Sequence, residues 1–225
     1  NKQFLPGVRI PRTLEITADL KTAAEFRDLI VLAIPSQYMR RILKRLKIYD
    51  IPKKTLFLSV TKGLETNTLM RMSEVIHEEL NGVKPAVLSG PTIAYEVARG
   101  LPTTAVVASP DRNLRALIAR TFNTDKFRIY TNDDIIGVEL AGSLKNIIAI
   151  ACGISDGLGF GTNTKAAILS RGLAEISRLG IRMGAKVKTF SGISGLGDLV
   201  TTCISPFSRN RYLGEQIGKG KKLNQ

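Results

Sequence analysis

Short apolar runs rich in β-branched residues alternate with amphipathic segments over the first 132 positions of this 225-residue chain. The run at 29–35 ends at Pro35, as a buried parallel strand does, and Ser36 is the expected N-cap of the helix that follows. Strands that alternate with helices of about a dozen residues predict a parallel, doubly wound α/β sheet. The other predicted strands cover residues 55–63, 86–91, 102–109 and 127–132, and the predicted helices cover 36–49, 65–80, 93–100 and 112–122.

The pattern changes after Asn132. Segments 133–154, 163–183 and 206–219 read as helix or loop, and none of them has a convincing strand pattern. We therefore expect an α/β domain over residues 1–132 and an all-α domain over residues 133–225.

The stretch 136–161 is a nearly uncharged run of helical length with Lys145 and Asn146 near its middle. An ammonium group withdrawn from water among apolar neighbours has a lowered pKa, which suits proton transfer. Alternatively, the lysine stem crosses an apolar face and its ammonium reaches water. On position alone the two interpretations are about equally supported.

The sequence gives little support for proton transfer by histidine or cysteine, or for a metal site. The single histidine, His77, lies in a charged amphipathic helix and is expected at the surface. Cys152 and Cys203 have no second pair at metal-ligand spacing, so we predict no metal site. Two cysteines without a signal-peptide pattern favour a cytoplasmic location. No apolar run is expected to reach the length of a membrane span, so we predict no membrane insertion.

The formal net charge of +14 is compatible with a nucleic-acid binder or with a protein that acts on small anions. The basic residues are scattered, and no aromatic side chains interleave with them as a base-stacking surface requires. The run 40–47 reads as a solvated helix face with its apolar residues turned inward. We therefore predict no nucleic-acid partner, although charge alone does not decide this.

Three strand ends carry polar or glycine-rich turns, namely residues 33–36, 61–65 and 89–94. Ligands of open α/β sheets bind at the carboxyl ends of the strands, so these turns are candidates for one site. In the helical part, Asp198 follows a glycine-rich approach, and residues 208–210 offer a hydroxyl, a guanidinium and an amide that suit a phosphate. Each turn has a plain alternative as a capped or solvent-exposed loop.

Six segments occur in an order that resembles one family. They are KGLE at 62–65, LSGPTIAYEVA at 88–98, IGVELAGSLKNIIAIACGISDGLGFG at 136–161, RGLAEISRLG at 171–180, GLGDLVTTC at 195–203 and SRNR at 208–211. The chain is similar to bacterial NAD(P)-dependent glycerol-3-phosphate dehydrogenases over essentially all its length. The resemblance implies a Rossmann-like dinucleotide-binding domain at 1–132, a helical substrate domain at 133–225, and NAD or NADP as the cofactor.

The resemblance also implies roles for individual residues. Lys145 corresponds to the proton-transferring lysine, and Lys62 and Arg209 correspond to residues that contact both substrate and cofactor. Ala94 corresponds to a cofactor contact. The implied substrate contacts also include Gly90, Thr92, Asn146, Asp198, Ser208 and Asn210. The implied reaction interconverts dihydroxyacetone phosphate and sn-glycerol 3-phosphate by hydride transfer and feeds phospholipid synthesis, with a small phosphorylated substrate as partner and a homodimer as a compatible assembly.

The sequence departs from the family pattern at both ends. The family's opening strand and glycine-rich dinucleotide loop do not precede Asn1 in the sequence, and closing helices do not follow KGKKLNQ. We therefore expect the 225 residues alone to bind NAD(P)H weakly and to have low activity. The alternatives are a related two-domain hydroxyacid dehydrogenase and a basic, non-catalytic binding protein.

Overall fold

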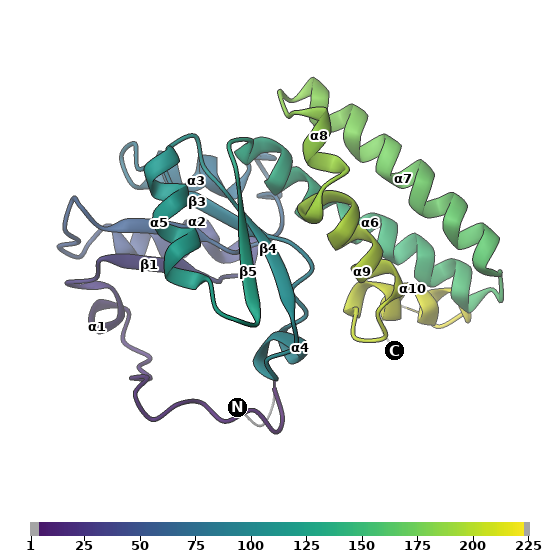
Figure 1. The fold of residues 1–225 in the computed structure, drawn as a ribbon, viewed down its shortest axis with the longest axis horizontal. Coiled ribbons are helices and arrows are strands. Elements are labelled where there is room, and N and C mark those ends of the chain that lie inside the picture. Colours follow the sequence, from purple (N-terminus) through teal and green to yellow (C-terminus); the bar gives the residue numbers. More distant parts are fainter. Residues whose placement is uncertain (1–4, 223–225) are drawn as a thin grey trace.

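The computed structural model describes residues 5–222 and contains one five-stranded sheet in the order β1-β2-β3-β4-β5, followed by a set of packed helices (Figure 1). The strands are β1 (Leu29–Leu32), β2 (Leu56–Ser59), β3 (Ala86–Ser89), β4 (Thr103–Ala108) and β5 (Phe127–Asn132). The helices around the sheet are α1 (Leu20–Ala24), α2 (Ser36–Leu46), α3 (Met72–Glu79), α4 (Ala94–Ala98) and α5 (Arg112–Phe122).

The sheet is mixed, which corrects the predicted all-parallel arrangement. Strands β1, β2 and β3 are parallel, but β4 runs antiparallel to β3 with Val87 opposite Ala108, and β5 runs parallel to β4. A parallel connection needs a crossover of a dozen or more residues, usually a full helix. The five-residue α4 is too short to carry the chain back along the length of β3 to the end where that strand begins. The eleven-residue α5 does span the strand length, between β4 and β5.

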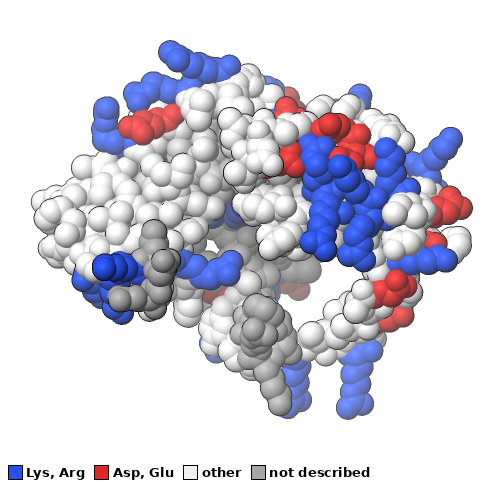
Figure 2. Space-filling model, turned by 180° about the vertical axis from the view of Figure 1, so that it is seen from behind, with Lys and Arg blue, Asp and Glu red and all other residues white. Residues whose placement is uncertain are grey.

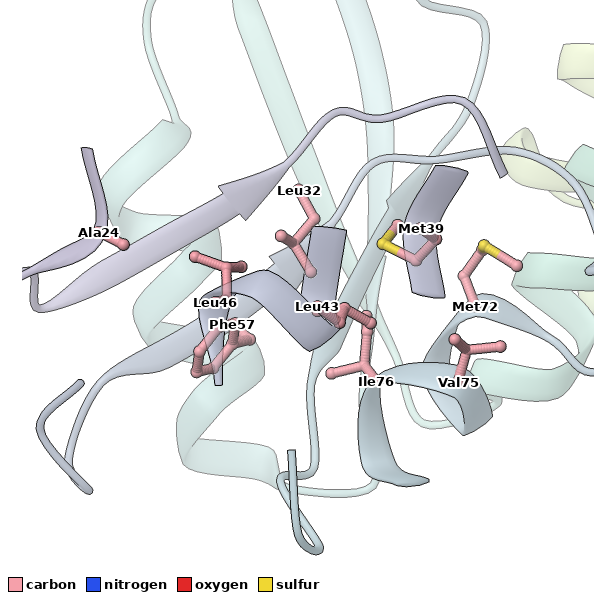
Figure 3. Close-up of a cluster of buried hydrophobic side chains, with 9 residues drawn as sticks. All are labelled: Ala24, Leu32, Met39, Leu43, Leu46, Phe57, Met72, Val75 and Ile76. Carbon is pink, nitrogen blue, oxygen red and sulfur yellow. The ribbon is translucent and has the colours of Figure 1, made fainter. Parts of the chain in front are cut away.

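Helices cover both faces of the sheet, as the doubly wound prediction requires. On one face, α2 and α3 pack on β1 and β2 through a cluster of buried apolar side chains (Figure 3). On the other face, Leu114 and Ile118 of α5 pack against Ala105 and Val107 of β4. The cluster drawn in Figure 3 consists of Ala24, Leu32, Met39, Leu43, Leu46, Phe57, Met72, Val75 and Ile76.

Two helix starts differ from the prediction. Pro35, and not Ser36, occupies the N-cap position of α2, so the Ser36 side chain does not cap the helix. Helix α3 begins at Met72 instead of near residue 65. Residues 64–71 form a turn closed by a bridge between Leu64 and Arg71, in which Leu69 has a left-handed φ of 59°.

The chain after β5 is helical. It contains α6 (Ile135–Gly157), α7 (Thr162–Arg182), α8 (Val187–Phe190), the π-helix η1 (Ile193–Gly197), α9 (Asp198–Ile204) and α10 (Arg209–Gly218). Helix α6 connects both parts, since Val138 packs against Val87 and Val106 of the sheet and its later residues pack against α7, α9 and α10.

Helix α6 is long and apolar enough to cross a membrane by length and composition, which corrects the expectation that no apolar run reaches that length. Half of its most apolar window is buried inside the protein. The helix also contains Glu139 and Lys145, whose charges are paired with Arg71 and Asp198. These contacts are those of a core helix that other elements surround.

The basic side chains do not form one continuous surface on the face shown in Figure 2. Lys and Arg side chains stand there in several separate groups, and acidic side chains lie beside some of them. In one acidic and basic cluster, Arg40 of α2 contacts three carboxylates, those of Glu65, Glu78 and Glu79. On this face the basic side chains are therefore divided among separate groups.

Candidate active site

Two lysines meet on one buried carboxylate where α6, α9 and the tip of β2 come together. The ammonium nitrogen of Lys62 donates to Asp198 Oδ2 at 2.6 Å and to the carbonyl oxygen of Gly90 at 2.9 Å. The ammonium of Lys145 donates to the other carboxylate oxygen, Asp198 Oδ1, and to Thr202 Oγ1. The side chains of Asp198 and Lys145 are 2% and 8% exposed, whereas that of Lys62 is 23% exposed, so one buried carboxylate balances one buried and one partly exposed cation.

The local sequence places each of these groups. Lys62 follows β2, at the carboxyl end of a parallel strand. Asp198 begins α9 directly after the glycine-rich π-helix η1, and a Cβ on Gly195 would lie 2.2 Å from the carbonyl oxygen of Phe190. Only glycine permits that approach, which explains the glycine-rich segment before the aspartate.

The environment lowers the pKa of Lys145 to about 8. Burial of the ammonium is the largest cause, and the nearby charge of Lys62 acts in the same direction, while Asp198 opposes both. A lysine with a pKa near neutrality can donate and accept a proton in the physiological range. Lys145 is only 6% exposed, which argues against an ammonium that reaches open water; its part in proton transfer stays a prediction.

Thr202 is a site residue that the sequence analysis missed. Its hydroxyl accepts a hydrogen bond from Lys145 at 2.6 Å and donates one to the carbonyl oxygen of Asp198 at 2.7 Å. The second bond orients the hydroxyl so that a lone pair faces the ammonium. The sequence does contain a signal for Thr202, because it lies four residues after Asp198, and residues four apart on a helix share a face.

Most predicted site residues line two neighbouring cavities. The first, of about 550 Å³, lies between α4, α6, α9 and α10, and the second, of about 740 Å³, lies at the carboxyl ends of β1 and β2. Ala94 and Arg209 line both cavities, so the two adjoin there. The predicted residues of the first cavity also include Thr92, Lys145, Ser208 and Asn210, and those of the second include Lys62 and Asn146.

Among the predicted site residues, Gly90 and Asp198 line neither cavity. Asn146 faces the second cavity, because neighbouring residues of a helix point about 100° apart and Lys145 faces the first. Gly90 offers its carbonyl oxygen to Lys62, with a φ of +147° and an ideal Cβ position 3.0 Å from Ala105 Cα. The conformation and the close approach both require glycine at this position.

Two of the three predicted strand-end turns come together, and the third contributes Ala94 to the same cavity. Residues 33–36 and 61–64 line the second cavity together, and Thr61 Oγ1 donates to the carbonyl oxygen of Ile34 at 2.7 Å. This cavity lies outside the carboxyl ends of parallel strands, where open α/β sheets bind nucleotide cofactors. Within residues 5–222 no cluster of His, Cys, Asp or Glu has the arrangement of a metal site.

The loop that carries the predicted phosphate group contacts is fixed by charge and by packing. Arg211 donates to Asp156 Oδ2 at 2.5 Å and to the carbonyl oxygen of Ser205 at 3.2 Å. The hydroxyl of Ser208 accepts from the N–H of Arg211 and caps α10. Arg209 follows this cap directly, at the N-terminus of α10, where the helix dipole favours anions.

Comparison with known proteins agrees with this architecture. Residues 1–115 match the family model described as NAD-dependent glycerol-3-phosphate dehydrogenase N-terminus, and residues 134–225 match the corresponding C-terminus model. The chain is 52% identical to the glycerol-3-phosphate dehydrogenases [NAD(P)+] of Moorella thermoacetica and Prosthecochloris aestuarii. All of this chain aligns with each, and it spans 67% and 68% of their respective lengths.

Solved structures give the same result. The crystal structure of glycerol-3-phosphate dehydrogenase from Coxiella burnetii superposes with a TM-score of 0.96 at 42% identity, over all of this chain and 68% of that one. The structure from Dunaliella salina superposes with a TM-score of 0.91 at 31% identity, over 97% of this chain and 38% of that one. The chain therefore belongs to the NAD-dependent glycerol-3-phosphate dehydrogenase family.

Proposed function

We propose that this protein interconverts dihydroxyacetone phosphate and sn-glycerol 3-phosphate with NAD(P)H and so supplies the glycerol phosphate of phospholipids. The main support is that buried Lys145 and partly exposed Lys62 both bind the buried carboxylate of Asp198 where two cavities adjoin. Residues 1–132 would hold the cofactor and residues 133–225 the substrate, since the sheet ends with β5 and the first cavity is lined largely by α6, α9 and α10.

The second cavity fits the nicotinamide end of the cofactor. It lies at the strand ends, and small residues such as Gly63 and Ala94 leave room for a planar ring. Lys62, Ala94 and Arg209 are the residues we assign to it. When bound, NAD(P)H supplies a hydride to C2 of the substrate.

The residues of the first cavity would complete the reaction. Arg209 and Asn210 bind the phosphate with charge-assisted and amide hydrogen bonds, and Ser208 shapes the turn that presents them. As C2 receives the hydride, its oxygen becomes negative. Lys145 stabilises that charge and donates a proton, while Lys62 adds a second positive charge and Asp198 and Thr202 hold both ammonium groups in place.

The test is reduction of dihydroxyacetone phosphate, followed as loss of NADH or NADPH absorbance, in the protein encoded by the complete reading frame. Lys145→Met keeps much of the stem volume and removes the proton, so the rate should fall at least about 10²-fold while the fold survives. Lys145→Arg should not restore it, because a guanidinium stays protonated. A folded Met variant with more than a tenth of the wild-type rate would show that Lys145 is structural.

The same assay separates this reaction from its nearest alternative. A related hydroxyacid dehydrogenase would reduce an unphosphorylated keto acid better than dihydroxyacetone phosphate, whereas Arg209 and Lys62 give this site a preference for a phosphorylated substrate. We also propose a cytoplasmic location, because Cys152 and Cys203 are both free thiols. We expect a homodimer, which light scattering would measure.

A further inference from the structure

The turn that carries Lys62 is attached to α6 by one hydroxyl group. The N–H of Gly63, the residue directly after Lys62, donates to Ser143 Oγ at 2.9 Å. Ser143 Oγ in turn donates to the carbonyl oxygen of Glu139 at 2.8 Å, one helical turn earlier. The hydroxyl therefore bridges the tip of β2 and the backbone of α6, two residues before Lys145.

The stem of Lys62 rests on the same part of α6. The Gly142 position faces the Lys62 stem, because a Cβ there would be in ordinary van der Waals contact with it, 3.6 Å from Lys62 Cγ and 3.7 Å from Cδ. The same Cβ would lie 2.7 Å from the hydroxyl of Ser89. Gly142 thus lets α6 approach Ser89 at the end of β3, beside the Lys62 stem, and Ser143 accepts the hydrogen bond that fixes the backbone at Gly63.

The opposite side of the turn is also closed. Gly63 has a φ of +145°, and a Cβ there would lie 2.5 Å from the hydroxyl oxygen of Ser36 on α2. The turn is therefore held between α2 and α6. Its position along α6 determines how far the Lys62 ammonium lies from Asp198 and from Lys145.

We propose that Ser143 is a positioning residue that holds Lys62 on Asp198 beside Lys145. It acts through Gly63 and touches neither substrate nor cofactor. This inference rests on the proposed function, in which Lys62 supplies the second positive charge of the reaction. Without the hydroxyl, the N–H of Gly63 loses its acceptor, and the turn is free to carry the ammonium of Lys62 away from the carboxylate.

The consequence for Lys145 has a definite sign. The groups that face it are Asp198 and the Cys203 thiol from α9, Lys62 from the β2 turn, and Arg209 across the first cavity. Among these, the charge of Lys62 lowers the pKa of Lys145. Retreat of Lys62 should therefore raise that pKa and weaken charge stabilisation at C2.

The experiment compares Ser143→Ala with Ser155→Ala in the protein encoded by the complete reading frame. Ser155 is a matched control because it is a buried serine of the same helix whose hydroxyl makes no hydrogen bond. We expect Ser143→Ala to lower kcat by about tenfold, the scale of one lost buried hydrogen bond, and to move the pH–rate profile to higher pH. Ser155→Ala should match the wild type, and Ser143→Thr, which keeps a hydroxyl, should restore most of the rate.

A double-mutant cycle shows whether Ser143 acts through Lys62. Ser143→Ala should have little further effect in a Lys62→Met background, because the residue that it positions is then absent. Equal effects in both backgrounds, or a Ser143→Ala profile like that of Ser155→Ala, would overturn the proposal.

A second readout separates this inference from the proposed function. If the wild type does not reduce dihydroxyacetone phosphate, the proposed function fails, but the titration of Lys145 is still measurable by NMR of methylated lysine side chains. A higher midpoint in Ser143→Ala than in Ser155→Ala supports the positioning role whatever the substrate. Equal midpoints overturn it.

Discussion

At the scale of single residues, the site depends on an unequal balance of charge. Lys62 and Lys145 each donate to one oxygen of the buried Asp198 carboxylate, so a net positive charge remains beside the cavities, with Lys145 buried and Lys62 partly exposed. In a one-to-one ion pair the two charges cancel, so no net positive charge would remain to stabilise a developing negative charge. The remaining charge is what a site for an anionic transition state requires.

The lowered pKa of Lys145 predicts opposite pH dependences for the two directions of the reaction. Oxidation of sn-glycerol 3-phosphate needs the neutral amine, so its rate should rise as pH increases through about 8 and then level off. Reduction needs the ammonium, so its rate should fall over the same range. Steady-state rates between pH 6 and 10 measure both. If the pH–rate profiles of Lys145→Met rise and fall over the same pH range as those of the wild type, the ionisation belongs to another group.

Arg209 should determine the preference for a phosphorylated substrate. Arg209 is exposed at the mouth of the first cavity, and Arg209→Ala removes a charge-assisted contact to the substrate phosphate. The KM for dihydroxyacetone phosphate should rise steeply, whereas unphosphorylated dihydroxyacetone, a poor substrate from the start, should be affected less. Equal losses with both substrates would mean that Arg209 does not bind the phosphate.

At the scale of elements, α6 and α10 pack with their backbones in contact, and glycines on both make this possible. A Cβ on Gly153 would lie 2.0 Å from the carbonyl oxygen of Arg211, and one on Gly214 would lie 2.1 Å from that of Ile150. Gly157 and Gly218 make equivalent approaches one turn later. This close packing brings Arg209, at the start of α10, to the cavity that Lys145 lines.

Gly214→Ala should separate the two helices, because the methyl group meets backbone that cannot move aside. We expect a loss of stability of about 1 to 3 kcal/mol, the usual range for overpacking, together with a higher KM for the phosphorylated substrate. Urea unfolding and steady-state kinetics measure the two effects. Gly197→Ala is the control, since Gly197 has a helical φ of −59° and its Cβ would meet nothing closer than 3.8 Å. Equal stabilities of the two variants would contradict this account of the helix pair.

At the scale of the whole molecule, a buried ionic network joins α6 to the start of α3, which packs on the sheet. Glu139 of α6 accepts from Arg71 Nη1 at 2.7 Å, and from the N–H and hydroxyl of Ser73 at the start of α3. Burial raises the pKa of Glu139, and the charge of Arg71 is the largest opposing influence. The network fixes the helix that carries Lys145 relative to the strands that carry the second cavity.

Arg71→Met should destabilise the protein more at pH 8 than at pH 5. The folded pKa of Glu139 is raised, so its contribution to stability is complete below the unfolded pKa and is lost as pH rises through the folded pKa. Removing Arg71 raises the folded pKa further, so the difference from the wild type should grow with pH and reach about 3 kcal/mol. Urea unfolding at both pH values measures this difference.

The double variant Arg71→Met with Glu139→Met provides the control. It removes both charges, and apolar replacements of a buried pair are often neutral, so it should recover most of the stability. A loss of stability in Arg71→Met that is independent of pH would show that Glu139 is not the group affected.

The sequence by itself determined most of the helices and strands, though not all of their bounds, and the types of residue in the candidate site. Local patterns in the sequence can be recognised without knowledge of the fold. They include the alternation of strand and helix, the apolar sequence neighbours of Lys145 and the family motifs. The direction of β4 was not readable in this way, because it depends on whether the connection can span the sheet, and α4 is too short to do so. The pairing of Lys62 and Lys145 on Asp198, the part played by Thr202, and the division of Lys145 and Asn146 between two cavities were decided by the tertiary structure. These properties depend on distances between residues far apart in the chain and on burial, which sets the pKa of Lys145, and neither exists until the chain has folded.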